Sequence, residues 1–270
     1  MQSHFSLIWE AVADAVPEHI ALIQGERRIS WRDYEDRAAR LAQGLIDAGL
    51  NHNSKVGMYL YNSPEYAETN FAAMKIGGVP INVNYRYLDE ELHYLLENAD
   101  IEALVFHSSL GDRVARVCDR LPMLKAMICV DDGLAEDDSM GPANGIAYDT
   151  FLAQASGAAR TQPQGDEIYM LYTGGTTGMP KGVMYPLDGF TEFFMRGFPP
   201  MIGLDPFENA DRFAPAAKQM VDANSAVVAM SGPPLMHGTG CWLGLMFQHM
   251  LGGTSVLLEN RGFKPEEVWR

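Results

Sequence analysis

The residues best suited to chemistry in this 270-residue chain lie between Tyr172 and Val183, in the run Tyr-Thr-Gly-Gly-Thr-Thr-Gly-Met-Pro-Lys-Gly-Val. Glycines let backbone amides turn toward a ligand, threonines add hydroxyl groups, and the lysine adds a positive charge. These groups suit a polyphosphate, because each hydrogen bond to a charged oxygen contributes roughly 1.5–3 kcal/mol. The run therefore predicts a loop that binds the phosphate end of a nucleotide.

Two other phosphate-binding patterns are excluded for this loop. The Walker P-loop requires Gly before its lysine and Ser or Thr after it, whereas Pro180 and Gly182 flank Lys181. A dinucleotide-binding fingerprint requires a helix directly after the glycines, and no helical pattern begins there. Composition alone leaves a plainer interpretation open, a glycine-rich turn between two strands, because Gly and Thr are common in turns.

A second candidate is His237, in the run Ser-Gly-Pro-Pro-Leu-Met-His-Gly that spans residues 231–238. Two prolines stiffen this loop and hold the side chains that follow in set directions. The histidine is thereby presented at the end of a predicted strand, between small residues. The spacing also fits a histidine bonded to a backbone carbonyl in a tight turn. His93 and His107 have no partner at ligand spacing and are assigned structural roles.

The elements that must position these loops follow from apolar periodicity and end signals. The predicted helices span 31–48, 64–77, 88–98, 148–155 and 186–196, and the predicted strands span 56–61, 79–83, 101–106, 125–130, 167–171, 225–230 and 255–258. Alternation of strands with helices predicts an α/β fold of layered, mostly parallel sheets flanked by helices. The stretch 131–165 is interpreted as a surface excursion or subdomain boundary, and 198–211 as an exposed insertion.

Composition and charge narrow the classes of function. The chain is 47% hydrophobic and has a net charge of -15. This negative charge disfavours a surface that binds nucleic acid, and it means that binding of a nucleotide would require positive groups close to the site. Glu10 and Asp14 interrupt the first apolar stretch, so no signal peptide is expected, and no apolar run reaches the length of a membrane span. The three cysteines, Cys118, Cys129 and Cys241, are spaced too irregularly for a zinc site and predict buried thiols of a cytoplasmic protein.

Acidic residues cluster near the starts of two predicted helices. They are Glu65, Glu68, Asp89, Glu90 and Glu91. Carboxylates in a first helical turn complement the helix dipole, so all five are interpreted as solvated helix ends.

The run from Tyr172 to Val183 closely resembles the signature loop of the adenylate-forming superfamily, which includes acyl-CoA synthetases, luciferases and peptide-synthetase adenylation domains. The family pattern is Tyr-Thr-Ser-Gly-Thr-Thr-Gly-x-Pro-Lys-Gly-Val, and this chain departs from it only at Gly174, where serine is usual. The 231–238 run is similar to the family's acyl-substrate motif. Weaker likeness at 67–79 and 248–258 extends the resemblance over essentially residues 1–270.

The resemblance implies a two-step reaction in which a carboxylic acid and Mg²⁺-bound ATP form an acyl-adenylate, and coenzyme A then displaces AMP. The residues assigned to the β- and γ-phosphates are Thr173, Gly174, Gly175, Thr176, Thr177 and Gly178. Lys181, supporting the leaving pyrophosphate or ordering the loop, is assigned to catalysis together with Thr176. His237 and Gly238 are assigned to the acid substrate.

The apolar character of five residues favours a bulky hydrophobic acid, such as a fatty acid or a steroid side-chain acid: Ile202, Met230, Trp242, Leu243 and Met246. Such residues also suit a core. The family's downstream motifs, among them Tyr-Gly-x-Thr-Glu and a C-terminal domain with a catalytic lysine, do not occur in this sequence. The resemblance therefore implies that residues 1–270 form an incomplete N-terminal adenylation domain, inactive alone.

Two alternatives to such a ligase remain open. The chain could be a catalytically inactive module that binds a nucleotide or a protein partner. It could instead be a luciferase-like relative that makes the same adenylate and passes it to another acceptor. A homodimer is also left open.

Overall fold

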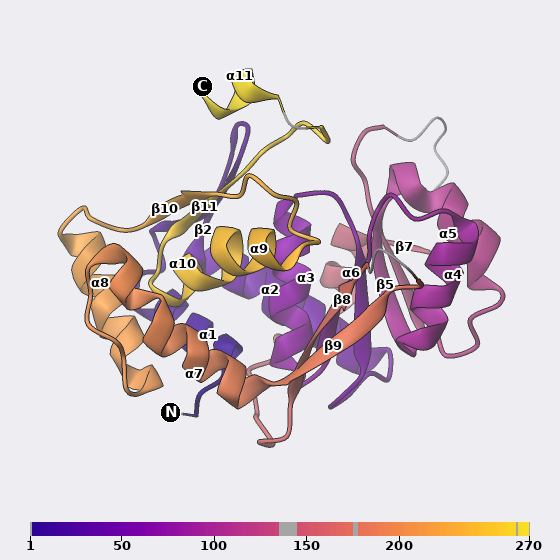
Figure 1. Cartoon of the computed structure of the whole chain (residues 1–270). Coiled ribbons are helices and arrows are strands. Elements are labelled where there is room, and N and C mark those ends of the chain that lie inside the picture. Colours follow the sequence, from indigo (N-terminus) through magenta and orange to yellow (C-terminus); the bar gives the residue numbers. More distant parts are fainter. Residues whose placement is uncertain (1, 135–144, 175–177, 263, 270) are drawn as a thin grey trace.

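The computed structural model describes residues 2–134, 145–174, 178–262 and 264–269. Its strands form two larger sheets and one hairpin (Figure 1). The first sheet has the order β10-β11-β1-β2, with β1 Ile20–Gln24, β2 Arg27–Ser30, β10 Val228–Met230 and β11 Thr254–Leu257. The second has the order β4-β3-β5-β6-β7, with β3 Lys55–Tyr59, β4 Val79–Asn82, β5 Ile101–His107, β6 Ala126–Val130 and β7 Ile146–Ala147. The hairpin joins β8 Ile168–Thr173 to β9 Lys181–Pro186.

The second sheet is parallel throughout, and in the first sheet only the β1–β2 pair is antiparallel. The predicted α/β class with mostly parallel sheets is therefore confirmed. The hairpin of β8 and β9 is antiparallel, so the glycine-rich run does lie between two strands. This placement agrees with the exclusion of a dinucleotide-binding fingerprint, since a strand and not a helix follows the glycines.

Helices cover both sheets. They are α1 Phe5–Ala15, α2 Trp31–Asp47, α3 Pro64–Lys75, α4 Asp89–Asn98, α5 Gly111–Cys118, α6 Tyr148–Gln154, α7 Leu187–Gly197, α8 Phe213–Asp222, α9 Gly238–Cys241, α10 Phe247–Met250 and α11 Pro265–Val268. A π-helical turn at Trp242–Met246 connects α9 to α10. The predicted starts of α2 and α3 are confirmed, because the hydroxyl groups of Ser30 and Ser63 accept the backbone N–H groups three residues on.

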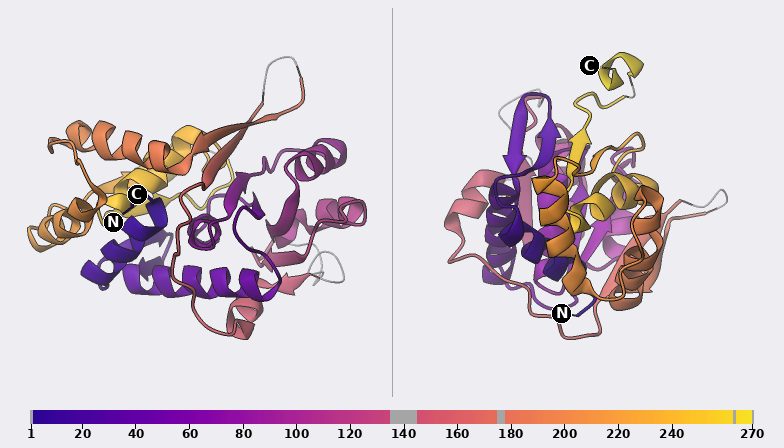
Figure 2. Two further views of the ribbon diagram at one scale, coloured as in Figure 1. Left: turned by 90° about the horizontal axis from the view of Figure 1, so that it is seen from below. Right: turned by 90° about the vertical axis from the view of Figure 1, so that its left-hand side faces the viewer.

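The position of each helix relative to the two sheets follows from the residues that it buries. All of α3 is buried, and it packs against β1 of the first sheet and β3 and β4 of the second. Helices α4 and α5 cover the other face of the second sheet, where Leu92, Leu95 and Val114 pack with Leu104 and Phe106. Figure 2 shows α3 in the interior and the β8–β9 hairpin directed away from the body of the molecule. Helix α3 thus lies between the two sheets, and α4 and α5 form an outer layer on the second sheet.

Two predicted surface segments contain more buried residues than expected. Most residues of 198–211 are exposed, as predicted, but Phe198, Phe207 and Ala210 are buried, and Phe198 stacks on Phe194 of α7. In the described part of 131–165, α6 buries Tyr148, Phe151 and Leu152. These two aromatic side chains and the leucine supply more apolar area than the surrounding polar residues suggested. The subdomain boundary at 131–165 remains a prediction.

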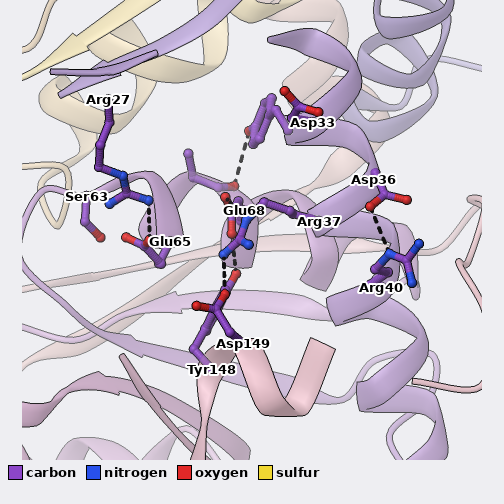
Figure 3. A network of polar contacts seen from close by, with 12 residues as sticks. Arg27, Asp33, Asp36, Arg37, Arg40, Ser63, Glu65, Glu68, Tyr148 and Asp149 are labelled. Carbon is purple, nitrogen blue, oxygen red and sulfur yellow. Dashed lines mark hydrogen bonds and ion pairs between the residues drawn. The ribbon is translucent and has the colours of Figure 1, made fainter. Parts of the chain in front are cut away.

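The acidic residues of α3 also differ from expectation. Glu68 is fully buried and Glu65 is 7% exposed, so neither is a solvated helix end. Arg37 of α2 and the Tyr148 hydroxyl bond to Glu68 at 2.8 and 2.7 Å, and Arg27 bonds to Glu65 at 2.7 Å (Figure 3). The arginines supply the compensation that a buried carboxylate requires. The three acidic residues of α4 do lie in its first turn, as predicted.

Cys129 and Cys241 are buried, as predicted, whereas Cys118 is half-buried; all three are free thiols. Within the described ranges, the helices are too short or too polar to cross a membrane.

Candidate functional site

The glycine-rich segment extends from the ends of β8 and β9. Thr173 is the last residue of β8 and pairs with Lys181, the first residue of β9, so both lie at the same end of the hairpin. Thr173, Gly174, Gly178 and Lys181 are all exposed. Gly175, Thr176 and Thr177 lie outside the described residues. The described part therefore places a hydroxyl, glycine amides and an ammonium group together at one accessible end of the hairpin.

Gly174 stands where the family pattern has serine. No atom lies within 4 Å of the position that a Cβ would occupy there. A serine side chain would therefore fit, and this departure leaves the shape of the segment unaffected.

The loop 231–238 is fixed by hydrogen bonds around two prolines. The Ser231 hydroxyl, in a buried residue, lies 2.6 Å from the carbonyl of Pro233 and 3.2 Å from that of Gly240. His237 itself is exposed and directly precedes α9. Its backbone N–H donates to the Pro234 carbonyl at 3.0 Å, which closes the turn. The ring nitrogens of His237 have no hydrogen bond to any described residue, so the ring is available to a ligand.

A cavity of about 340 Å³ brings the two loops together. Its lining includes Thr173 and Gly174 from the hairpin and His237 and Gly238 from the second loop. Gly238 permits this approach, because a Cβ there would lie 3.0 Å from the Leu171 side chain of β8. A cavity with a few convergent polar groups is the usual form of a small-molecule site. Four of the predicted site residues thus share one cavity.

The charge on the wall of this cavity favours an anion. Burial lowers the pKa of His237 below its ordinary value, and the positive charge of Arg86 lowers it further. The imidazole is therefore neutral near pH 7 and can donate one hydrogen bond to an oxygen. Arg86 is exposed and adds a positive charge near the same mouth. A carboxylate bound near these two side chains could accept a hydrogen bond from the imidazole and would be attracted by the charge of Arg86.

Sequence reasoning missed three polar residues that line the cavity: Asn82, Asn84 and Tyr87. One signal for them was available. Asn82 ends the apolar strand Val79–Asn82, and a polar residue at the carboxyl end of a parallel strand is a common place for a ligand-facing or loop-holding side chain. Its partners could not be identified from the sequence, since they lie 90 and 154 positions away.

The residues that suggested a bulky acid do not form one group. Met246 is fully buried in the core, and Trp242 donates to the Tyr169 hydroxyl at 3.2 Å. Ile202, Met230 and Leu243 are exposed. Met246 therefore supports the core interpretation, and the set gives little information on substrate.

The structural role assigned to His107 is supported, because its Nδ1 accepts the backbone N–H of Tyr61 at 3.0 Å and its ring is buried. In the described ranges, His, Cys, Asp and Glu side chains form no group of three or more that could hold a metal ion.

The approach of α9 to the second loop gives a steric prediction. A Cβ on Gly240 would lie 2.2 Å from the Pro234 carbonyl oxygen, a backbone atom that cannot rotate away. Gly240→Ala is therefore expected to lower the free energy of unfolding by about 1–3 kcal/mol and to displace the His237 turn. Gly232→Ala in the same loop is the control, since no atom lies within 4 Å there. Urea unfolding measures both, and equal stabilities would contradict the prediction.

Comparisons with known proteins agree with this geometry. The protein-family model described as AMP-binding enzyme matches residues 9–270. A medium/long-chain-fatty-acid–CoA/3-oxocholest-4-en-26-oate–CoA ligase of Mycolicibacterium smegmatis is 37% identical over 265 residues, which cover 97% of this chain and 46% of that protein. A 3-oxocholest-4-en-26-oate–CoA ligase of Rhodococcus rhodochrous is 37% identical over 262 residues, covering 97% and 45%.

Solved structures show the same fold. The benzoate CoA ligase from Burkholderia xenovorans LB400 superimposes with a TM-score of 0.76 at 17% identity, covering 98% of this chain and 47% of that one. The chain therefore spans about half the length of the relatives it matches.

Proposed function

Because this chain belongs to the family of AMP-binding enzymes, we propose that its 172–183 segment and its 231–238 loop are the phosphate-binding and acid-binding parts of a carboxylic acid–CoA ligase. The observation that carries the proposal is the cavity that Thr173 and Gly174 share with His237 and Gly238. It supports a site in which the phosphates of ATP and a carboxylate lie close enough to react.

The proposed chemistry has two steps. A carboxylate oxygen attacks the α-phosphorus of ATP, the bond to the bridging oxygen breaks, and pyrophosphate leaves with its electron pair, which gives an acyl-adenylate. The sulfur of coenzyme A then attacks the acyl carbonyl, its proton passes to solvent, and the carbon–oxygen bond to AMP breaks. Positioned donors stabilise the charge on the transferring and leaving phosphates.

The roles of the side chains follow from their chemistry. Lys181 would neutralise charge on the leaving pyrophosphate, and Thr173 would donate its hydroxyl to a phosphate oxygen. We assign Gly175, Thr176, Thr177 and Gly178 to the same task. His237 would orient the carboxylate and not act as a base, since a carboxylate is already ionised near pH 7.

The other small molecules of the proposed reaction are Mg²⁺, coenzyme A and the carboxylic acid. Mg²⁺ would bind mainly through ATP phosphates and water. When bound, it would supply charge neutralisation. Coenzyme A is proposed as the acceptor. The acid is proposed to be a fatty acid or another bulky hydrophobic acid, because the relatives are named for such substrates.

Replacement of Lys181 tests the proposal. Lys181→Ala should weaken binding of Mg-ATP by roughly 10- to 150-fold, the equivalent of one hydrogen bond to a charged group at 1.5–3 kcal/mol. The measurement is isothermal titration calorimetry with the 270-residue chain. Lys218→Ala is the matched control, because Lys218 is an exposed lysine bonded only to Asp222 within α8. Equal effects of the two substitutions, or an unmodified chain without affinity for Mg-ATP, would contradict the proposal.

A longer reading frame, if the source provides one, separates a ligase from an inactive binding module. A ligase should catalyse acid-dependent exchange between ATP and pyrophosphate and lose it in Lys181→Ala. A binding module should show no exchange in either form.

A further inference from the structure

Asn82 occupies the point where the two loops of the proposed site meet. It is the last residue of β4 and is 8% exposed. Its Oδ1 accepts the backbone N–H of Tyr172 at 2.7 Å, and its Nδ2 donates to the carbonyls of Tyr172 at 2.9 Å and Met236 at 2.8 Å. The carboxamide thus bonds to the residue before Thr173 and to the residue before His237.

The chemistry of asparagine suits this place. A carboxamide offers one acceptor and two donor hydrogens in one plane, one donor more than a peptide group. It therefore bonds to Tyr172 as a neighbouring strand would and still has a donor left for Met236. A carboxylate lacks the donors and an aliphatic side chain lacks all three groups, so neither can replace it.

Other side chains hold only one of the two loops. Asn62 accepts the Leu235 backbone N–H at 2.8 Å, and the Tyr66 hydroxyl donates to the Leu235 carbonyl at 3.0 Å. Asn98 accepts the Tyr172 hydroxyl at 2.8 Å. Among the hydrogen bonds of the described residues, those of Asn82 are the only ones from one side chain to the backbones of both β8 and the 231–238 loop.

We propose that Asn82 is a positioning residue that sets the distance between the phosphate-binding segment and the acid-binding loop. It acts through Tyr172 and Met236, so it positions both reactants without being a catalytic residue. Loss of its carboxamide should make both the phosphate-binding segment and the acid-binding loop more mobile. A displacement of about 1 Å between two reactants is enough to slow a reaction by about 100-fold. The role of Asn82 in the reaction rests on the proposed function, whereas its effect on the order of the two segments can be measured in the chain without ligand.

The first experiment is amide hydrogen exchange measured by NMR on the 270-residue chain without ligand. Asn82→Ala should speed exchange about tenfold or more at both Tyr172 and His237, since each loop loses at least one hydrogen bond. Asn82→Ser is the second variant, in case the alanine variant does not fold. A cooperative thermal transition shows which variants are folded.

Variants of two other asparagines distinguish a specific role of Asn82 in holding both segments from a general loss of order around the cavity. Asn62→Ala should speed exchange at Leu235 and His237 and leave the Tyr172 amide protected. Asn98→Ala should leave His237 unchanged. The inference is overturned if a folded Asn82 variant leaves His237 exchange unchanged, or if Asn62→Ala exposes Tyr172 to the same degree.

The second experiment is calorimetry with Mg-ATP and with decanoate as probes. Asn82→Ser should weaken both ligands, whereas Asn62→Ala should weaken decanoate only. If the unmodified chain binds neither probe while the exchange pattern holds, the proposed function fails and the positioning role stands. If the chain binds both probes and Asn82→Ser binds them equally well, the positioning role fails and the proposed function stands.

Discussion

Acidification from pH 7 to pH 5 should lower the free energy of unfolding by roughly 6 kcal/mol, about 2 kcal/mol for each of three buried histidines. Burial lowers the pKa of His4 to about 4, of His107 to about 4 and of His249 to about 3. In the unfolded chain these rings take up protons near pH 6.5. The unfolded state therefore binds more protons between pH 6.5 and 4, so stability is complete above this window and is lost as the pH falls through it.

The contacts of the three rings explain why protonation is costly. His107 Nδ1 accepts the Tyr61 backbone N–H, and a proton on that nitrogen would remove the acceptor. His4 Nδ1 lies 2.9 Å from the Ser6 hydroxyl and 3.3 Å from its backbone nitrogen. His249 is fully buried and has the rings of Trp31 and Tyr34 edge-on at 5.0 and 5.2 Å. Among the described residues, no carboxylate lies within bonding distance of any of the three rings.

Urea unfolding at pH 7, 6 and 5 measures the effect. The variant His107→Asn keeps an acceptor for the Tyr61 N–H without a group that titrates in this range, so about 2 kcal/mol of the acid sensitivity should disappear. A free energy of unfolding that does not change between pH 7 and pH 5 would show that these rings are protonated, or accessible to water, in the folded chain.

Much of the fold could be predicted because its signals are local. Ser30 and Ser63 mark the starts of α2 and α3, and a serine cap acts within its own turn. Strands buried on both faces read as continuous apolar runs, which identified β5 and β6. Helix α8 was missed, since its polar face and an internal Pro215 hide the apolar side that packs on α1.

The errors arose where partners are distant in sequence. Glu68 looks like a solvated helix residue until Arg37 and Tyr148 are known to face it, and these lie 31 and 80 positions away. The site shows the same limit. Residue types identified the glycine-rich segment and His237, but their shared cavity depends on β4 lying beside β8, which no local pattern reveals. The roles of these residues remain predictions.

Removal of the cation beside Glu68 should be the most damaging single change to the interior polar network. Glu68 is fully buried, and burial raises the pKa of its carboxyl above the ordinary value, against the opposing effect of Arg37. Arg37→Met should lower the free energy of unfolding by about 3–5 kcal/mol at pH 8, because the carboxylate then lacks a compensating charge in the interior.

Arg40→Met is a close control on the same helix. Arg40 bonds to Asp36 at 2.8 Å, but both side chains are about half exposed, so its loss should cost much less stability than the loss of Arg37 (Figure 3). A second control is Arg37→Met combined with Glu68→Gln, which removes the buried charge itself. This pair should recover part of the stability. Equal losses in the two single variants would show that Glu68 is solvated.

The pH dependence of the Arg37→Met deficit distinguishes a buried charge from lost packing. Without Arg37 the pKa of Glu68 rises further, so the folded variant binds a proton that the unfolded chain releases above pH 4.5. Its stability relative to the parent chain should then fall as the pH rises from 5.5 to 8, opposite in sign to the histidine effect. A deficit that is constant over this range would indicate packing alone.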